Sequence, residues 1–373
     1  MGYDDNMRPC SLLVFAAAWT WLCLVEALDD DKVAKICLLG MTGTNPASGT
    51  GNIGRAAMSE MVSLLMNSDK SARIEISVLS RRGGETVDPF YADVASTQVQ
   101  VKAVQGSIFE PLDVAKTCTD AKLALFVAPT GNDISGESEV ESIRRILQGL
   151  RSANVPKLLM TCGQAWSSTG NAGPMKFDYQ LQDVMVKQVA EEASPFQDYA
   201  IVQTASWMET FFENSFDGIK AMGIFIGCAM PKPICFTKKS DIGIVTGKVA
   251  ALLLQANDTI PHHEYDLYDP IPYTDREILA MASEITGKEL WGIGKTMYAF
   301  VAKLRPVFEF FGSGNGTHLA KIFAYLLEYG YVPDGPSASE NQKAVLELGF
   351  TPTSLRTYFE EELSAKGDTA EEL

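Results

Sequence analysis

The chain has 373 residues, of which 46% are hydrophobic, 21% charged and 9% aromatic. This composition excludes disordered, collagen-like and disulfide-scaffold classes and leaves enough apolar mass for a large α/β unit. The 47 acidic residues outnumber the 31 basic residues, which gives a formal net charge of -16. Such a charge argues against a general electrostatic grip on nucleic acid or anionic lipid, and it leaves open a small ligand held by local positive groups.

The cysteines and histidines carry no metal-binding pattern. Seven cysteines are too few and too scattered for a disulfide framework, and neither they nor the three histidines have the spacing of zinc ligands. We therefore expect no metal site. Five cysteines lie in the body of the chain, and this odd number favours buried thiols at Cys37, Cys118, Cys162, Cys228 and Cys235.

Residues 1–28 resemble a secretory signal peptide. Arg8 precedes an apolar run from Ser11 to Val25, and acidic residues follow. Since the run is shorter than the roughly 20 residues that span a bilayer, we expect no stable membrane span in the mature chain. The leader predicts entry into the secretory pathway, with the ER, secretion or an organelle as the destination. The alternatives are an apolar helix packed on the domain and a cytoplasmic protein. Two sequons compatible with passage through the ER lie at Asn257 and Asn315.

From Lys35 onward, short β-rich runs alternate with helical patterns. Strands are expected at 35–40, 73–80, 99–106, 122–129, 157–162 and 198–205, and helices at 55–66, 138–153 and 180–193. This alternation implies right-handed βαβ crossovers and an α/β fold, a Rossmann-like doubly wound parallel sheet with a smaller C-terminal substrate lobe. The expected parts are a Rossmann domain at 33–230, the lobe at 231–362 and an acidic tail at 363–373, with disorder from Glu360 onward.

A glycine-rich segment joins the first expected strand to the first helix. Within it, the run from Gly49 to Gly54 fits GxGxxG. Glycines allow a tight turn, close approach of a pyrophosphate and packing of the helix on the strand, and the helix N-terminus then faces the anion. Fourteen residues separate Gly40 from Arg55, where the helix is expected to begin, against the usual connection of about 2 to 6. The loop thus carries an insertion; the alternative is a flexible surface loop.

Arg81 and Arg82 follow the second strand, where an NAD-binding fold would place an acidic residue for the ribose 2′-hydroxyl. Guanidinium groups suit a 2′-phosphate through charge-assisted hydrogen bonds. The pair therefore favours NADP(H) over NAD as the cofactor. The alternative is a solvated basic pair after a strand.

The two ends of the loop, GMTG at Gly40 to Gly43 and GNIG at Gly51 to Gly54, resemble the GATGxxG loop of the NmrA-like group of atypical short-chain dehydrogenases. The resemblance spans about residues 35–361. Further similar segments lie at 199–212, 241–254, 273–290 and 348–361.

The resemblance implies NADP(H) at the carboxyl ends of the strands and a substrate cleft between the sheet and the C-terminal lobe. It implies a phosphate site at Gly40, Gly43, Thr44, Gly49, Gly51, Asn52, Ile53 and Gly54, and a 2′-phosphate site at Arg81 and Arg82. It places Ser107 and Ile108 near adenine, Ala128 and Pro129 along the ribose, and Thr161 and Cys162 near nicotinamide. Ser107 stands where relatives often carry Asp.

The catalytic centre departs from the YxxxK pattern of short-chain dehydrogenases, in which a lysine lowers the pKa of a tyrosine proton donor. Tyr179 lies at a plausible distance after the fifth strand, but Asp183 occupies the lysine position. Lys187, two helical turns after Tyr179, is the candidate cation, with Glu191 one turn later. The alternative is a surface pair that stabilises the helix.

Two main hypotheses follow. The first is an NADP(H)-dependent oxidoreductase that reduces a small carbonyl or an activated double bond. The second is a non-catalytic NADP(H)-binding redox sensor, which the missing YxxxK favours. A sugar-nucleotide epimerase-like extended dehydrogenase is a further alternative. The expected partner is a small-molecule substrate, and the oligomeric state stays open. Side chains expected beside the cleft are Trp207, Met208, Phe211 and Phe212.

Overall fold

The computed structural model describes residues 33–41, 51–85, 87, 91–127, 139–163, 196–225, 233–292 and 336–364. Its centre is a seven-stranded sheet in the order β10-β6-β5-β4-β1-β2-β3, in which every pairing is parallel. The strands are β1 (Ala34–Leu39), β2 (Ile74–Ser80), β3 (Val99–Gln105), β4 (Leu123–Val127), β5 (Lys157–Gly163), β6 (Asp198–Thr204) and β10 (Glu264–Leu267). The order runs outward in both directions from β1, which confirms the expected Rossmann-like α/β fold.

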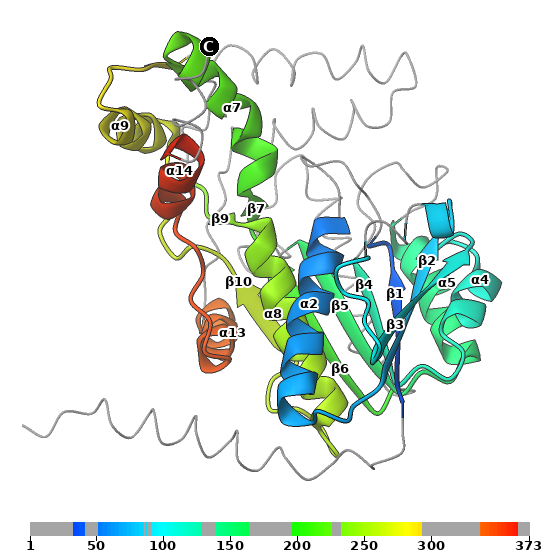
Figure 1. Ribbon diagram of the computed structural model, residues 1–373. Coiled ribbons are helices and arrows are strands. Elements are labelled where there is room, and N and C mark those ends of the chain that lie inside the picture. The colour runs from blue at the N-terminus through cyan, green and yellow to red at the C-terminus, as the bar shows by residue number, and fades with distance from the viewer. Residues whose placement is uncertain are drawn as a thin grey trace, which may run out of the picture.

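Helices cover both faces of the sheet (Figure 1). One face carries α2 (Gly51–Ser68) and α8 (Lys239–Gln255), and the other carries α4 (Pro111–Thr117) and α5 (Glu139–Ser152). Strand β1 is apolar on both sides, because Ile36 and Leu38 belong to the core under α2 while Cys37 and Leu39 belong to the core under α4 and α5. The continuous apolar run of this strand therefore follows from its central place.

Two glycines bring α8 against α2. A Cβ atom on Gly243 would lie 2.3 Å from the Cβ atom of Ala56, and one on Gly247 would lie 2.5 Å from the carbonyl oxygen of Ala57. A side chain at either position would push the two helices apart. The small residues thus fix the distance between α2 and α8.

We expect Gly243→Ala to lower the free energy of unfolding by about 1 to 3 kcal/mol, because the new methyl group collides with α2. At an exposed helical position the same exchange would stabilise by up to about 1 kcal/mol through helix propensity. The sign of the change, measured by urea denaturation, therefore reports the helix contact. An increase in stability would contradict it.

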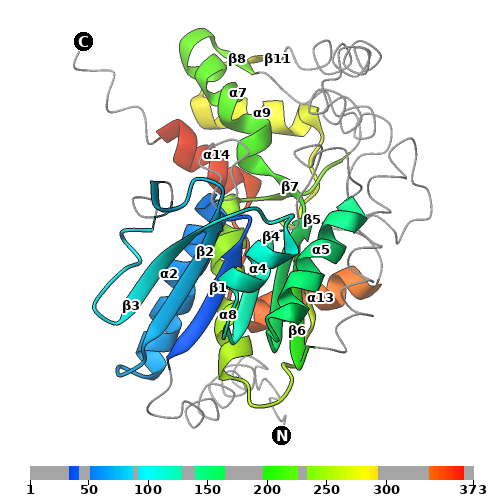
Figure 2. The same cartoon turned by 90° about the vertical axis from the view of Figure 1, so that its right-hand side faces the viewer.

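A smaller lobe lies beyond the carboxyl ends of the strands (Figure 2). It contains α7 (Met208–Met222), α9 (Asp275–Thr286) and α14 (Leu355–Ser364). Short strands pair β7 (Ser206–Trp207) with β9 (Phe236–Thr237), and β8 (Ile224–Phe225) with β11 (Trp291–Gly292). The core of the lobe is aromatic, and its buried rings include Phe212, Phe216, Phe225, Phe236 and Phe359.

The chain passes between sheet and lobe more than once. Helix α7 lies before residue 230 in the sequence but is part of the lobe. Helix α8 and strand β10 come after residue 230, yet β10 is a strand of the central sheet and α8 packs on that sheet. The division at 230/231 therefore does not separate the sheet from the lobe. The physical reason is that α8 supplies the second helix on its face of the sheet, where its apolar side covers β5 and β6.

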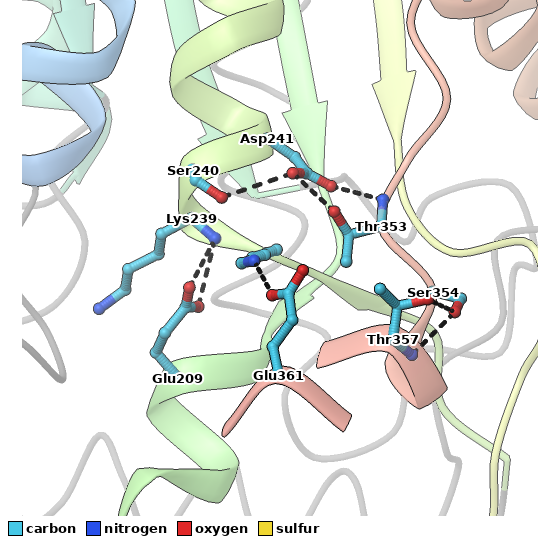
Figure 3. Close-up of polar contacts among 9 residues, drawn as sticks. Glu209, Lys239, Ser240, Asp241, Thr353, Ser354, Thr357 and Glu361 are labelled. Atoms are coloured by element: carbon cyan, nitrogen blue, oxygen red, sulfur yellow. Dashed lines mark hydrogen bonds and ion pairs between the residues drawn. The ribbon is translucent and has the colours of Figure 1, made fainter. Parts of the chain in front are cut away.

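The end of the described chain is held by two buried carboxylates. Asp241 accepts hydrogen bonds from the backbone N–H of Thr353 at 2.6 Å and from its hydroxyl at 3.0 Å (Figure 3). Asp269 accepts one from the N–H of Leu355 at 2.8 Å. Burial raises the pKa of both carboxyl groups, and these hydrogen bonds oppose the shift. The segment before α14 is thereby tied to α8 and to the end of β10.

The expectation of disorder from Glu360 onward is wrong for residues 360–364. Helix α14 continues to Ser364, and Glu361 accepts a hydrogen bond from the Lys238 ammonium at 2.5 Å. Arg356 pairs with Glu360 one turn along the helix. Ion pairs and the packing of Phe359 in the lobe outweigh the acidic composition.

The expectation of buried thiols is wrong for Cys37 and Cys118, which form a disulfide across 81 residues of sequence. The residue count gave no sign of it, because only the fold brings β1 next to the end of α4. Cys235 is a buried free thiol, as expected, and burial raises its pKa to about 12. Cys228 lies outside the described residues.

Two acidic side chains of β10 lie near α13 (Pro336–Glu347), which packs on that strand. Glu264 accepts hydrogen bonds from the amides of Gln203 and Asn341, each at 3.2 Å. Asp266 is 2% exposed, and burial together with the Glu264 charge raises its pKa to about 7. The carboxyl group of Asp266 therefore keeps its proton at pH values well above the ordinary pKa of an aspartate, 3.8.

Asp266 should make the protein less stable as the pH rises. Since its pKa is higher in the folded chain than in the unfolded chain, its contribution is complete in acid and is lost between its ordinary value of 3.8 and about 7. This decline in the free energy of unfolding is at most about 1.4 kcal/mol per pH unit, and Asp266→Asn should abolish it. Urea denaturation at pH 4 to 8 measures the free energy of unfolding of both proteins. The control is Asp258→Asn at an exposed carboxyl. An unchanged pH dependence in Asp266→Asn would disprove the assignment.

Among the described residues, no helix is both long and apolar enough to cross a membrane. The leader at 1–28, the helix expected at 180–193 and residues 365–373 lie outside the described residues.

Candidate functional site

The strand order reverses between β1 and β4: one half of the sheet continues from β1 to β2 and β3, and the other half from β4 to β5 and β6. Helix α2 begins at the carboxyl edge of the sheet beside that point. Helix α2 starts at Gly51, four residues before the expected Arg55, so Asn52, Ile53 and Gly54 form its first turn. No acidic residue lies in that turn. The first backbone amides of the helix, which have no acceptor within the helix, and the positive end of its dipole therefore lie at the carboxyl edge, where they would stabilise an anion.

Two glycines shape the approach to α2. Gly40 ends β1 with a φ of +71°, a conformation that favours glycine and turns the chain out of the strand. At Gly54, a Cβ atom would lie 2.6 Å from the Cβ of Met41 and 2.7 Å from the hydroxyl of Tyr91. That hydroxyl is buried and donates a hydrogen bond to the carbonyl oxygen of Met41 at 2.8 Å. Gly40 thus provides the turn, and Gly54 allows the helix to pack on the strand.

Arg81 and Arg82 are exposed in the turn after β2, next to β1 in the sheet. Two side chains hold the backbone of this turn. The N–H of Arg82 donates a hydrogen bond to the Ser80 hydroxyl at 3.3 Å, and the carbonyl oxygen of Arg81 accepts one from the side-chain amide of Gln105 at 3.4 Å. Within the described ranges, neither guanidinium forms an ion pair. Both are therefore available to an anionic ligand at the carboxyl edge.

The turn after β3 carries Ser107 and Ile108, both half-buried. Asp113, from the first turn of α4, accepts a hydrogen bond from the N–H of Ser107 at 2.9 Å. A Cβ atom on Gly106 would lie 2.6 Å from the Cγ of Asp113, so the turn and the helix are in close contact. No local sequence pattern indicated a role for Asp113, because its carboxylate comes from the helix that follows the turn.

Thr161 lies on β5 with 1% of its surface exposed. Its hydroxyl is 3.2 Å from the hydroxyl of Thr246 on α8. The Thr161 side chain thus lies between the sheet and α8. The remaining expected site residues Gly43, Thr44, Gly49, Ala128, Pro129, Tyr179 and Lys187 lie outside the described residues, as does the Cys162 side chain.

The first residue of α8 places a cation at the same edge. Lys239 is 3% exposed, and its ammonium lies 5.2 Å from the centre of the Trp207 ring. Both carboxylate oxygens of Glu209 accept a hydrogen bond from the backbone N–H of Lys239, at 3.0 and 3.2 Å (Figure 3). Burial raises the pKa of Glu209, while these contacts oppose the shift. The only signal in the sequence was a lysine at the start of a helical pattern.

The four side chains expected beside the cleft have different surroundings. Trp207 and Phe211 are half-buried, whereas Met208 and Phe212 are fully buried in the aromatic core of the lobe. The expectation is therefore wrong for Met208 and Phe212, because they fall on the face of α7 that packs against Phe236 and Phe359.

No family model and no curated protein matches the sequence. Solved structures do match. A triphenylmethane reductase of Citrobacter sp. in complex with NADP(H) has a TM-score of 0.59 at 14% identity, covering 88% of this chain and 99% of the other. An NADPH-dependent quinone oxidoreductase of Escherichia coli in complex with NADPH has a TM-score of 0.60 at 14% identity, covering 88% of this chain and 99% of the other. The chain has the fold of these reductases.

The same fold occurs in a nucleoside-diphosphate-sugar epimerase of Staphylococcus aureus, with a TM-score of 0.61 at 14% identity over 88% of this chain and 100% of the other. The similarity covers sheet and lobe together. These neighbours agree with the fold that the resemblance to the NmrA-like group implies.

Proposed function

We propose that the protein binds NADP(H) across the carboxyl edge of β1 and β2 and acts as an oxidoreductase on a small carbonyl or an activated double bond. The observation that carries the proposal is the first turn of α2, free of acidic residues and fitted to β1 through Gly40 and Gly54. Two exposed guanidinium groups stand on the neighbouring strand end. The neighbours in complex with NADP(H) and NADPH agree with it.

In this proposal each part of the edge has one task. The amides of Asn52 and Ile53 bind the pyrophosphate, and Arg81 and Arg82 bind the 2′-phosphate through charge-assisted hydrogen bonds. The turn at Ser107 lies along the adenine. Gly54 supports this arrangement because the missing Cβ atom lets the first turn of α2 pack closely on the end of β1. NADPH, when bound, would supply the hydride for the reduction.

Calorimetry with NADPH and NADH tests the binding proposal. We expect heat of binding for NADPH and weaker binding for NADH. Absence of heat for both nucleotides would end the proposal, whatever the protein's activity.

Turnover is tested by NADPH oxidation across a panel of small carbonyl compounds. Tyr179→Phe and Lys187→Ala should lower the rate if Tyr179 donates the proton and Lys187 assists it. The redox-sensor alternative rests on Asp183, which stands at the lysine position of YxxxK. Tight binding of NADPH without oxidation of any substrate would favour that alternative.

We also propose that residues 1–28 direct the chain into the secretory pathway. The disulfide between Cys37 and Cys118 suits an oxidising compartment, and the sequon at Asn257 lies on an exposed turn after α8. The full chain with a C-terminal tag, expressed in eukaryotic cells, should lose residues 1–28 and enter the ER. A cytosolic protein with an intact N-terminus would disprove this.

A further inference from the structure

The start of α8 lies beyond the N-terminus of α2. A Cβ atom on Gly243 would lie 2.9 Å from the carbonyl oxygen of Ile53, so α8 touches the first turn of α2 at that residue. Lys239 is four residues earlier, on the same face of α8 and about 6 Å further along its axis. Because the two helices run in the same direction from the carboxyl edge (Figure 1), the backbone of Lys239 lies about one helical turn beyond the level of Ile53, on the side of the carboxyl edge.

A second contact fixes the position of Lys239 along the sheet. Thr246, seven residues after Lys239 and on the same helical face, has its hydroxyl 3.2 Å from that of Thr161 on β5. Trp207, whose ring lies 5.2 Å from the Lys239 ammonium, belongs to β7, which begins two residues after the end of β6. Lys239 therefore stands on the β5 and β6 side of β1. Arg81, Arg82 and Ser107 stand on the β2 and β3 side.

The charge of Lys239 matches what the edge needs. The pyrophosphate of a dinucleotide carries two negative charges, and the chain has a formal net charge of -16. Arg55, in the second turn of α2, is paired with Asp93 at 3.5 Å. The Lys239 side chain extends from α8 away from Asp241, which faces Thr353 instead (Figure 3). Its ring contact with Trp207 holds the ammonium at the edge.

We propose that Lys239 binds the nicotinamide half of the dinucleotide, with its ammonium at the phosphate and ribose of that half. The inference rests on the proposed binding of NADP(H) and adds a contact for the nicotinamide half of the dinucleotide. The dinucleotide then lies across β1, its adenosine end held by Arg81 and Arg82 and its nicotinamide end by Lys239. Trp207 and Glu209 are positioning residues, because they hold the side chain and the backbone of Lys239.

The test compares Lys239→Met with Lys248→Met, which removes a lysine from the same helix where it pairs with Glu60. Calorimetry is run with NADPH and with 2′,5′-ADP, which lacks the nicotinamide half. Lys239→Met should weaken NADPH binding about 10- to 100-fold and leave 2′,5′-ADP binding unchanged. Lys248→Met should change neither. Equal NADPH affinity in Lys239→Met and the wild type would overturn the inference.

A second measurement uses the wild-type chain and does not depend on a folded variant. Periodate opens only the nicotinamide ribose of NADP⁺, because the 2′-phosphate removes the diol of the other ribose. A lysine amine in contact with the resulting aldehyde forms an imine with loss of water, and borohydride reduces the imine to a stable amine. Peptide mass spectrometry should find the label on Lys239. A label on Lys187 or another lysine, and not on Lys239, would overturn the inference.

Binding of NADPH and 2′,5′-ADP by the wild type distinguishes a failure of the proposed function from a failure of the inference about Lys239. If the wild type binds neither NADPH nor 2′,5′-ADP, the dinucleotide site itself is wrong, and the role of Lys239 falls with it. If the wild type binds both and the Lys239 results are negative, only the inference about Lys239 fails.

Discussion

Replacing both Cys37 and Cys118 with alanine is expected to lower the free energy of unfolding by about 2 to 5 kcal/mol. The disulfide closes a loop that contains α2, β2, β3 and α4, and it joins the central strand to the helix layer on one face of the sheet. Without it the unfolded chain has more conformations, and two buried sulfur atoms leave unfilled space in the core. Urea denaturation of the oxidised proteins measures the difference.

Dithiothreitol supplies the internal check on this prediction. It should destabilise the wild type and leave the Cys37→Ala/Cys118→Ala variant unchanged. Cys235→Ala, which removes a buried sulfur without removing a cross-link, should remain sensitive to dithiothreitol. A wild-type protein with no response to the reductant would disprove the stabilising role of the disulfide.

Replacing both Arg81 and Arg82 with alanine is expected to weaken NADPH binding about 100-fold and NADH binding much less. Each guanidinium contributes charge-assisted hydrogen bonds to a phosphate that NADH lacks, at about 1.5 to 3 kcal/mol per bond. The measurement is the ratio of the two dissociation constants by calorimetry at fixed salt.

The matched control is Arg73→Ala, an exposed arginine just before the other end of β2. This variant removes a positive charge from the same strand but far from the carboxyl edge, so it should leave the ratio unchanged. If the double variant loses affinity for NADPH and NADH equally, the pair does not read the 2′-phosphate.

Strand β1 could be predicted because burial on both faces makes it a continuous apolar run, and β2 and β3 could be predicted because β-branched residues alternate with polar ones. The expected strands at 35–40, 73–80 and 99–106 agree with β1, β2 and β3 within one residue at each end. The expected helix at 138–153 agrees with α5 just as closely. Strand β10 gave no signal, because Glu264 and Asp266 interrupt a run of only four residues.

The site was predictable only where local sequence determines it. The roles of Gly40 and Gly54 follow from the backbone of one connection; the sequence indicated that its glycines matter but left open which of them makes the tight turn. The start of α2 was misplaced because glycine has low helix propensity, while packing against α8 extends the helix to Gly51. Lys239 and the disulfide depend on residues far apart in the chain, so no local pattern contained them.

The C-terminal helix has a consequence for folding during synthesis. Leu355, Tyr358 and Phe359 of α14 are part of the lobe core formed with α7, although α7 is synthesised more than a hundred residues earlier. The aromatic face of α7 therefore leaves the ribosome without its final cover. Chaperones that bind exposed aromatic surface would meet it there, and chains truncated before Leu355 would keep that surface exposed and aggregate.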